Sequence, residues 1–136
     1  PIEAWEVPFD VKSCALGFAH TLVLDSNGKL HALGDNGKGQ VTGAASKASV
    51  VRQPIVPEPV QGEEVLCMAA GLFHSACVTQ QGHVVTWGGG AASHSTWIPP
   101  DNGRAVGVAC GRKYTIAWTE DGSIYSWGAD NKYGKS

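Results

Sequence analysis

The chain has 136 residues, ten lysines and arginines against twelve acidic residues, and a formal net charge of −2. This size predicts one domain, and the near-neutral charge argues against a non-specific nucleic-acid binder, which presents a strongly basic face. The 43% of hydrophobic residues is too high for a disordered chain, and no apolar run reaches the roughly 18 residues that a membrane span needs.

Three segments of the chain are similar, and each predicts three strands joined by tight turns. In the first, a strand of small residues ends at 16 and is followed by Gly17 and a second strand from His20. The Asn27-Gly28 pair then predicts a hairpin, because glycine and asparagine tolerate the positive φ of primed turns. The second and third segments keep the same spacing of 11 and then 6 residues between their glycines, at 71, 82 and 88 and at 111, 122 and 128.

Proline-marked connectors between these segments predict an additional outer strand. Proline is confined to the edges and ends of strands, and Pro54, Pro57 and Pro59 lie within and just after the apolar residues near 50–56. Residues 96–99 form a shorter equivalent, and residues 5–9 precede the first segment in the same way. We therefore expect three four-stranded antiparallel units, at about 1–43, 44–90 and 91–136, each beginning with its outer strand, and almost no helix.

The cysteines and the polar motifs do not predict a reactive site. Gly88-Gly89-Gly90 lacks the Lys-Ser/Thr pair of a phosphate-binding loop, and residues 35–38 lack the spaced carboxylates of a calcium loop. We expect no enzyme activity, no cofactor and no metal site. The cysteines lie in apolar stretches without zinc-type spacing, so we expect buried, reduced thiols and a cytoplasmic or nuclear location. They are Cys14, Cys67, Cys77 and Cys110.

Several aromatic and histidine side chains have expected structural roles. His20 and His74 occupy equivalent positions, where an imidazole bonded to turn backbone is expected. Trp127 is expected in the core of its unit, against Trp118 or Tyr125 across the hairpin, and its replacement by alanine is expected to be strongly destabilising. The other histidines are expected to be solvated, namely His31, His83 and His94.

The turns that follow the first glycine of each unit form the candidate interaction surface. Large apolar side chains and a basic pair suit protein contact, because aromatic residues and arginine dominate binding hot spots. The surface consists of Phe18, Leu72, Phe73, Arg112 and Lys113. In the alternative, Phe18 and Leu72 pack beneath neighbouring loops. The connector 42–52, with Lys47 and Arg52, is a second candidate for the interaction surface. In the alternative, this connector is a solvated loop without a binding role.

Together these residues resemble the regulator of chromosome condensation repeat family, with its pattern G-x-x-H-(S/T)-x-x-L, a glycine hairpin and W-G-x-N-x-x-G-Q-L-G. The second unit has Gly89-Gly90 in place of the tail with asparagine, and the third has Tyr114 in place of histidine. The resemblance implies an all-β fold of β-propeller blades, here an incomplete propeller of about three blades. The matching structural repeat positions are Gly17, His20, Gly34, Gly71, His74, Trp87, Gly88, Gly111, Trp127 and Gly128.

The resemblance and the lack of catalytic motifs favour a non-catalytic protein-interaction module, a scaffold with a protein partner and neither nucleic acid nor membrane. The alternative implied by the family is part of a guanine-nucleotide exchange factor, or releasing factor, for a small Ran-like GTPase. No residue here matches a wedge that such exchange would need. In either case, completion of the propeller is expected from the same parent chain, a second copy or another chain.

Overall fold

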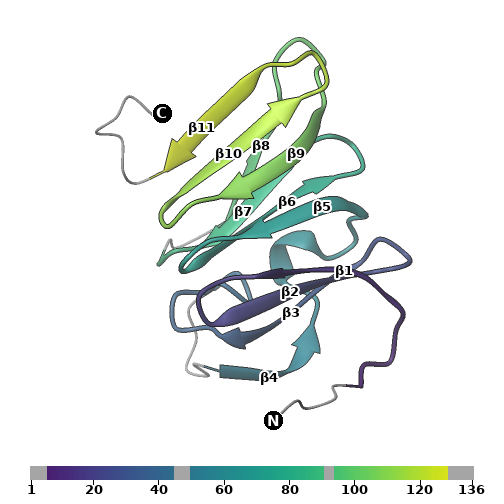
Figure 1. Ribbon diagram of the computed structural model, residues 1–136, viewed down its shortest axis with the longest axis vertical. Helices are drawn as coiled ribbons and strands as arrows, with labels where there is room; N and C mark the ends of the chain where they lie inside the picture. Colours follow the sequence, from purple (N-terminus) through teal and green to yellow (C-terminus); the bar gives the residue numbers. More distant parts are fainter. Residues whose placement is uncertain (1–5, 45–49, 91–93, 129–136) are drawn as a thin grey trace.

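The computed structural model describes residues 6–44, 50–90 and 94–128, which form three antiparallel sheets stacked along the long axis of the molecule (Figure 1). In chain order the elements are β1 (Val11–Leu16), β2 (His20–Asp25), β3 (Leu30–Asp35), β4 (Val50–Ile55), the 3-10 turn η1 (Glu58–Val60), β5 (Val65–Ala70), β6 (His74–Thr79), β7 (Val84–Gly88), β8 (Ser95–Trp97), β9 (Ala105–Cys110), β10 (Tyr114–Thr119) and β11 (Ile124–Gly128). The predicted all-β fold of propeller blades is confirmed, and the described ranges contain no helix that could span a membrane.

The three sheets have the same strand order, and the fourth strand belongs to the sheet that precedes it in the chain. The orders are β1-β2-β3-β4, β5-β6-β7-β8 and β9-β10-β11. Gly34 of β3 pairs with Val51 of β4, and Val84 of β7 pairs with Trp97 of β8. The expectation that each unit begins with its outer strand is therefore wrong. After β3 or β7 the chain turns back onto the free edge of its own sheet before it crosses to the next one.

The sheets are consequently offset from the repeat units of the sequence. They span residues 11–55, 65–97 and, for the three-stranded sheet, 105–128. Residues 6–9 of the expected strand 5–9 are not in a strand, and Trp5 lies outside the described residues.

The hairpins between the second and third strands have the predicted geometry. Gly28, Gly82 and Gly122 have φ values of +83°, +85° and +89°. A side chain at these positions would strain the backbone, which explains the fixed glycine of each repeat. These hairpins lie at one end of the sheets, beside the connectors that lead to the next sheet. For example, the amide of Gln80 donates to the carbonyl of Glu64.

A hydrophobic core lies between each pair of neighbouring sheets. Between the first and second sheets, long aliphatic side chains such as Leu22 and Leu24 pack against Trp87, and all are almost fully buried. Between the second and third sheets the core is made of small residues such as Ala76 and Ala117. These side chains alternate along each strand with residues of the opposite face, as the period of two requires.

The cysteines are free, but their burial is not uniform. Cys77 is buried and Cys67 and Cys110 are half-buried, whereas Cys14 on β1 is exposed. Burial raises the pKa of Cys77 and Cys110 to about 12, so these two remain protonated thiols. The expectation of four buried thiols is wrong for Cys14, because that side chain points away from the second sheet, which covers the neighbouring Ala15.

Candidate protein-interaction face

The turn after the first strand of each sheet is built around a glycine and the ring three residues later. A Cβ atom at Gly17 would lie 2.2 Å from Cε1 of His20 and 2.8 Å from the carbonyl oxygen of Gly71. At Gly71 the distances would be 2.2 Å to Cε1 of His74 and 2.6 Å to the carbonyl oxygen of Gly111. Only glycine leaves room for both the ring and the next sheet, so the repeat fixes these turns side by side.

The two equivalent histidines link neighbouring sheets. Nε2 of His20 lies 3.0 Å from Oγ of Ser75, and Nε2 of His74 lies 3.2 Å from Oγ1 of Thr115. Because the Ser75 hydroxyl donates to the carbonyl of Gln40 at 2.7 Å, it accepts its second bond from the His20 ring. Each ring therefore contacts a hydroxyl of the next repeat, and a backbone hydrogen bond at His74 or Tyr114 of that repeat partly offsets the lowering of its pKa by burial.

The sequence pattern contained these hydroxyl residues, but the sequence interpretation assigned them no partner. A serine or threonine directly follows the histidine or tyrosine in all three units, at Thr21, Ser75 and Thr115. That regularity was visible in the sequence, but only the stacking of the sheets shows which ring each hydroxyl meets.

These links predict a dependence of stability on pH. Burial lowers the pKa of both His20 and His74, so the folded chain binds fewer protons than the unfolded chain below the ordinary histidine pKa. The free energy of unfolding is expected to decrease as the pH falls below about 6.5, by at most about 1.4 kcal/mol per pH unit for each histidine. Denaturant unfolding measured at successive pH values checks this.

A matched pair of variants tests whether His20 and His74 cause this dependence of the free energy of unfolding on pH. His20→Gln with His74→Gln removes both titrating rings and is expected to flatten the curve, whereas His94→Gln, at an exposed position, is expected to leave its slope unchanged. An identical slope in the double variant and the unmodified chain would contradict the assignment.

His31 differs from the expectation for a solvated histidine. It is half-buried, its Nε2 lies 2.8 Å from Oδ2 of Asp25, and its ring stacks on Phe9 with the centroids 3.9 Å apart. Burial alone would raise the pKa of Asp25, but hydrogen bonds from His31 and from two backbone amides lower it overall. His83 is half-buried and His94 is exposed.

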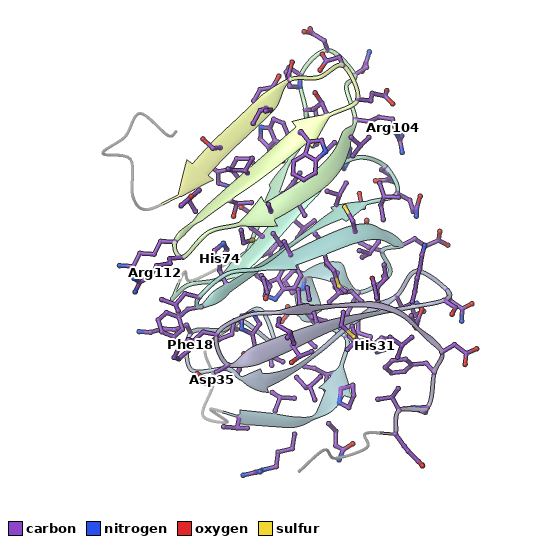
Figure 2. The ribbon with its side chains drawn as sticks, in the orientation of Figure 1. Phe18, His31, Asp35, His74, Arg104 and Arg112 are labelled. Atoms are coloured by element: carbon purple, nitrogen blue, oxygen red, sulfur yellow. The ribbon has the colours of Figure 1, made fainter. Side chains whose placement is uncertain are left out.

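The five residues of the predicted interaction surface lie together at one end of the sheets. Phe18 is 72% exposed, and its ring meets Phe73 edge to face, with the centroids 6.1 Å apart. The amide of Leu72 donates to the carbonyl of Arg112 at 3.3 Å, which joins the second turn to the third. Lys113 is exposed beside Arg112, and Figure 2 shows Phe18 and Arg112 at the same edge. Phe18 therefore does not pack beneath a neighbouring loop, whereas Leu72 is half-buried.

The two ends of the described sheets carry opposite charge. The end with the interaction surface has three basic side chains and Asp35, whereas acidic residues dominate the hairpin end, where Arg104 lies (Figure 2). The hairpin end contains Asp10, Glu58, Glu63, Glu64, Asp101, Glu120 and Asp121 against Lys12, Lys29 and Arg104, and the surface end contains Lys38, Arg112 and Lys113. Such a field favours approach of an acidic partner to the interaction surface. Of the second candidate, the connector 42–52, Lys47 lies outside the described residues and Arg52 is exposed on β4.

A cavity of about 500 Å³ opens between the second and third sheets at this same end. Phe73, His74, Arg112 and Lys113 line it on the side of the turns. Trp127 lines it from β11, together with Trp87, Thr115 and residues of β7 and β8.

Trp127 packs against the core between the second and third sheets, as expected, but it is not fully buried. It is half-buried, and its ring contacts Trp97 of the second sheet with the centroids 5.5 Å apart. Tyr125 contacts the same Trp97 at 4.8 Å, so both side chains face the second sheet. Trp118 lies on the other face of β10, because it is an odd number of positions from Thr115, the strand partner of Trp127.

The comparisons with known proteins agree with this arrangement. The sequence profile of the Regulator of chromosome condensation (RCC1) repeat matches residues 11–40 and 105–135. The chain is 36% identical to the E3 ubiquitin-protein ligase HERC2 of Homo sapiens, over 88% of this chain but 3% of that protein. It is 28% identical to the secretion-regulating guanine nucleotide exchange factor of Bos taurus, over 92% of this chain and 30% of the relative.

The fold recurs in a solved structure of the yeast protein Prp20p. The crystal structure of Prp20p from Saccharomyces cerevisiae superposes with a TM-score of 0.72 and 21% identity, over 90% of this chain and 33% of that one. This chain therefore spans a third or less of the length of each of these relatives. The match of the profile, the relatives and the stacked four-stranded sheets agree that the chain is built from repeats of the regulator of chromosome condensation family.

Proposed function

We propose that the chain is a non-catalytic protein-interaction module whose contact face consists of Phe18, Leu72, Phe73, Arg112 and Lys113. The observation that carries the proposal is that these side chains, from turns far apart in the sequence, lie side by side at one end of the sheets. A partner would meet an exposed aromatic ring beside two cations, which is the composition of a binding hot spot. His20 and His74 nearby take part in links between sheets, which supports a structural rather than a catalytic role for them.

A photo-crosslinking experiment tests this proposal. A photoreactive phenylalanine analogue placed at position 18 of the chain is expected to form a covalent product with a partner protein in cells. The same analogue at Gln61, an exposed position at the hairpin end, is the control and is expected to give no such product. Arg112→Ala with Lys113→Ala should reduce the product from position 18. Equal products from both positions would contradict the proposed face.

An exchange factor for a small GTPase is the second candidate, because relatives suggest it. One relative is a guanine nucleotide exchange factor, and the study of Prp20p concerns its binding to Gsp1p and histones. Ran loaded with a fluorescent guanine nucleotide and incubated with the chain separates the two candidates. A module that only binds leaves the rate of nucleotide release unchanged, whereas accelerated release would overturn the scaffold proposal.

We also propose that further blades complete the propeller, supplied by the same parent chain, a second copy or another chain. Apolar side chains exposed on the outer sheets support this, because such surfaces mark association sites. The free thiols support a cytoplasmic or nuclear location, where cysteines stay reduced.

A further inference from the structure

A segment of the chain itself fills the gap between the first and second sheets. Residues 36–41, which follow β3, insert there, and Gln40 and Val41 are fully buried. The backbone carbonyl of Gln40 accepts two hydrogen bonds, from Oγ of Ser75 at 2.7 Å and from Nε1 of Trp87 at 3.0 Å. The indole and the hydroxyl of the second sheet thus hold a peptide carbonyl.

Among the described residues, the equivalent place between the second and third sheets is a cavity. Thr115 and Trp127 occupy the repeat positions of Ser75 and Trp87, and both line the cavity of about 500 Å³. In the part of the chain that the structure describes, no group accepts the N–H of Trp127. The connector from β7 to β8 has six residues, 89–94, whereas the connector from β3 to β4 has fourteen, 36–49.

We propose that this cavity binds an acidic peptide segment of a partner protein, with a peptide oxygen of that segment accepting the indole N–H of Trp127. This proposal rests on the proposed interaction function and gives it a defined site. The sheet positions that hold the Gln40 carbonyl in the first gap are repeated in the second, so the natural ligand is again polypeptide. Arg112 and Lys113 border the opening and favour carboxylate side chains.

The walls of the cavity also suit a peptide more than a free anion. Phe73 and Trp127 supply apolar surface, and the cations are confined to the exposed turn of the third sheet. A volume of about 500 Å³ lies in the usual range of ligand cavities, which are largely apolar with a few placed polar groups. A small inorganic anion would leave that apolar surface uncovered.

Nuclear magnetic resonance of the indole N–H groups tests the proposal on the 136-residue chain. The probe is a synthetic peptide with the sequence of residues 35–41, Asp-Asn-Gly-Lys-Gly-Gln-Val, in which glutamate replaces Lys38. The signal of Trp127, identified by its loss in Trp127→Phe, is expected to shift on titration with the peptide. The signal of Trp118 is expected to stay, because that side chain does not line the cavity and lies on the opposite face of the third sheet.

Charge variants and competing ligands complete the test. Arg112→Ala with Lys113→Ala is expected to weaken peptide binding at least about tenfold, a loss of about 1.4 kcal/mol. Lys12→Ala with Lys29→Ala, which changes the same charge at exposed positions outside the cavity, is expected to leave it unchanged. A static Trp127 signal, equal binding by both double variants, or equal shifts with inorganic phosphate or a single-stranded oligonucleotide would overturn the proposal.

The two experiments fail independently. If crosslinks from position 18 form while the Trp127 signal remains static, the interaction face stands and the cavity is not its peptide site. If the peptide shifts Trp127 while position 18 gives no specific crosslink, the cavity binds peptide and the proposed face is wrong.

Discussion

Replacing Trp87 by alanine is expected to lower the free energy of unfolding by about 3–5 kcal/mol, the usual loss for truncation of a buried aromatic side chain. Trp87 is 2% exposed in the core between the first and second sheets. Its removal leaves a cavity and takes one of the two donors from the buried carbonyl of Gln40. The loss therefore combines packing and hydrogen bonding.

Trp127 provides a matched control for this prediction, because it occupies the same position of the repeat. It is half-buried and has no hydrogen-bond partner among the described residues, so Trp127→Ala is expected to cost about half as much or less. Urea unfolding of the two variants measures the difference. Equal losses would show that the repeat position rather than the local burial determines the contribution of this tryptophan.

The fold was largely predictable because glycines hold the repeat in register. The positive φ of Gly28 and the close approach at Gly17 both require glycine, and these requirements recur in every unit at the same spacing. The alternation of apolar residues along β2, β6 and β10 predicted that each sheet has a buried face. These glycines and this alternation are set by the local geometry of the backbone, so they can be read from a single sequence.

Other features depended on how the sheets pack against one another, and a single sequence does not show which sheet each strand or side chain contacts. The outer strand Val50–Ile55 was expected, but its hydrogen bonds go to the preceding sheet rather than the following one. Trp127 was assigned to the core of its own hairpin, whereas its neighbours are set by a strand of the second sheet. His31 was expected in solvent, but Phe9, from a segment without regular strand structure, stacks on its ring.

The candidate site was predicted in part for the same reason. The turn residues from Phe18 to Lys113 could be placed on one face because the repeat aligns their turns. The cavity could not, because it forms between two sheets and stands out only beside residues 36–41, which fill the equivalent gap between the first and second sheets.

The outer face of the third sheet predicts association of the isolated chain. Ile124 is 72% exposed and Trp118 is 40% exposed on the face turned away from the second sheet. Trp118 lies flat over Gly107, where a Cβ atom would be 2.1 Å from the ring. At the opposite end of the stack, Leu16 of β1 is 74% exposed. Apolar patches of this kind are covered by a neighbouring blade in a closed propeller.

Light scattering of the isolated chain is therefore expected to show a species larger than the 14.2 kDa monomer. Two copies joined head to tail would supply six sheets, within the range of about 4 to 8 blades that close a propeller. Ile124→Arg places a charge on the outer face and should shift the chain towards the monomer. Ile98→Arg introduces the same charge at an exposed isoleucine of the connector after β8 and should leave association unchanged. A sharp monomer with a cooperative melt for the unmodified chain would contradict the prediction, because three sheets would then be stable without a partner to cover them.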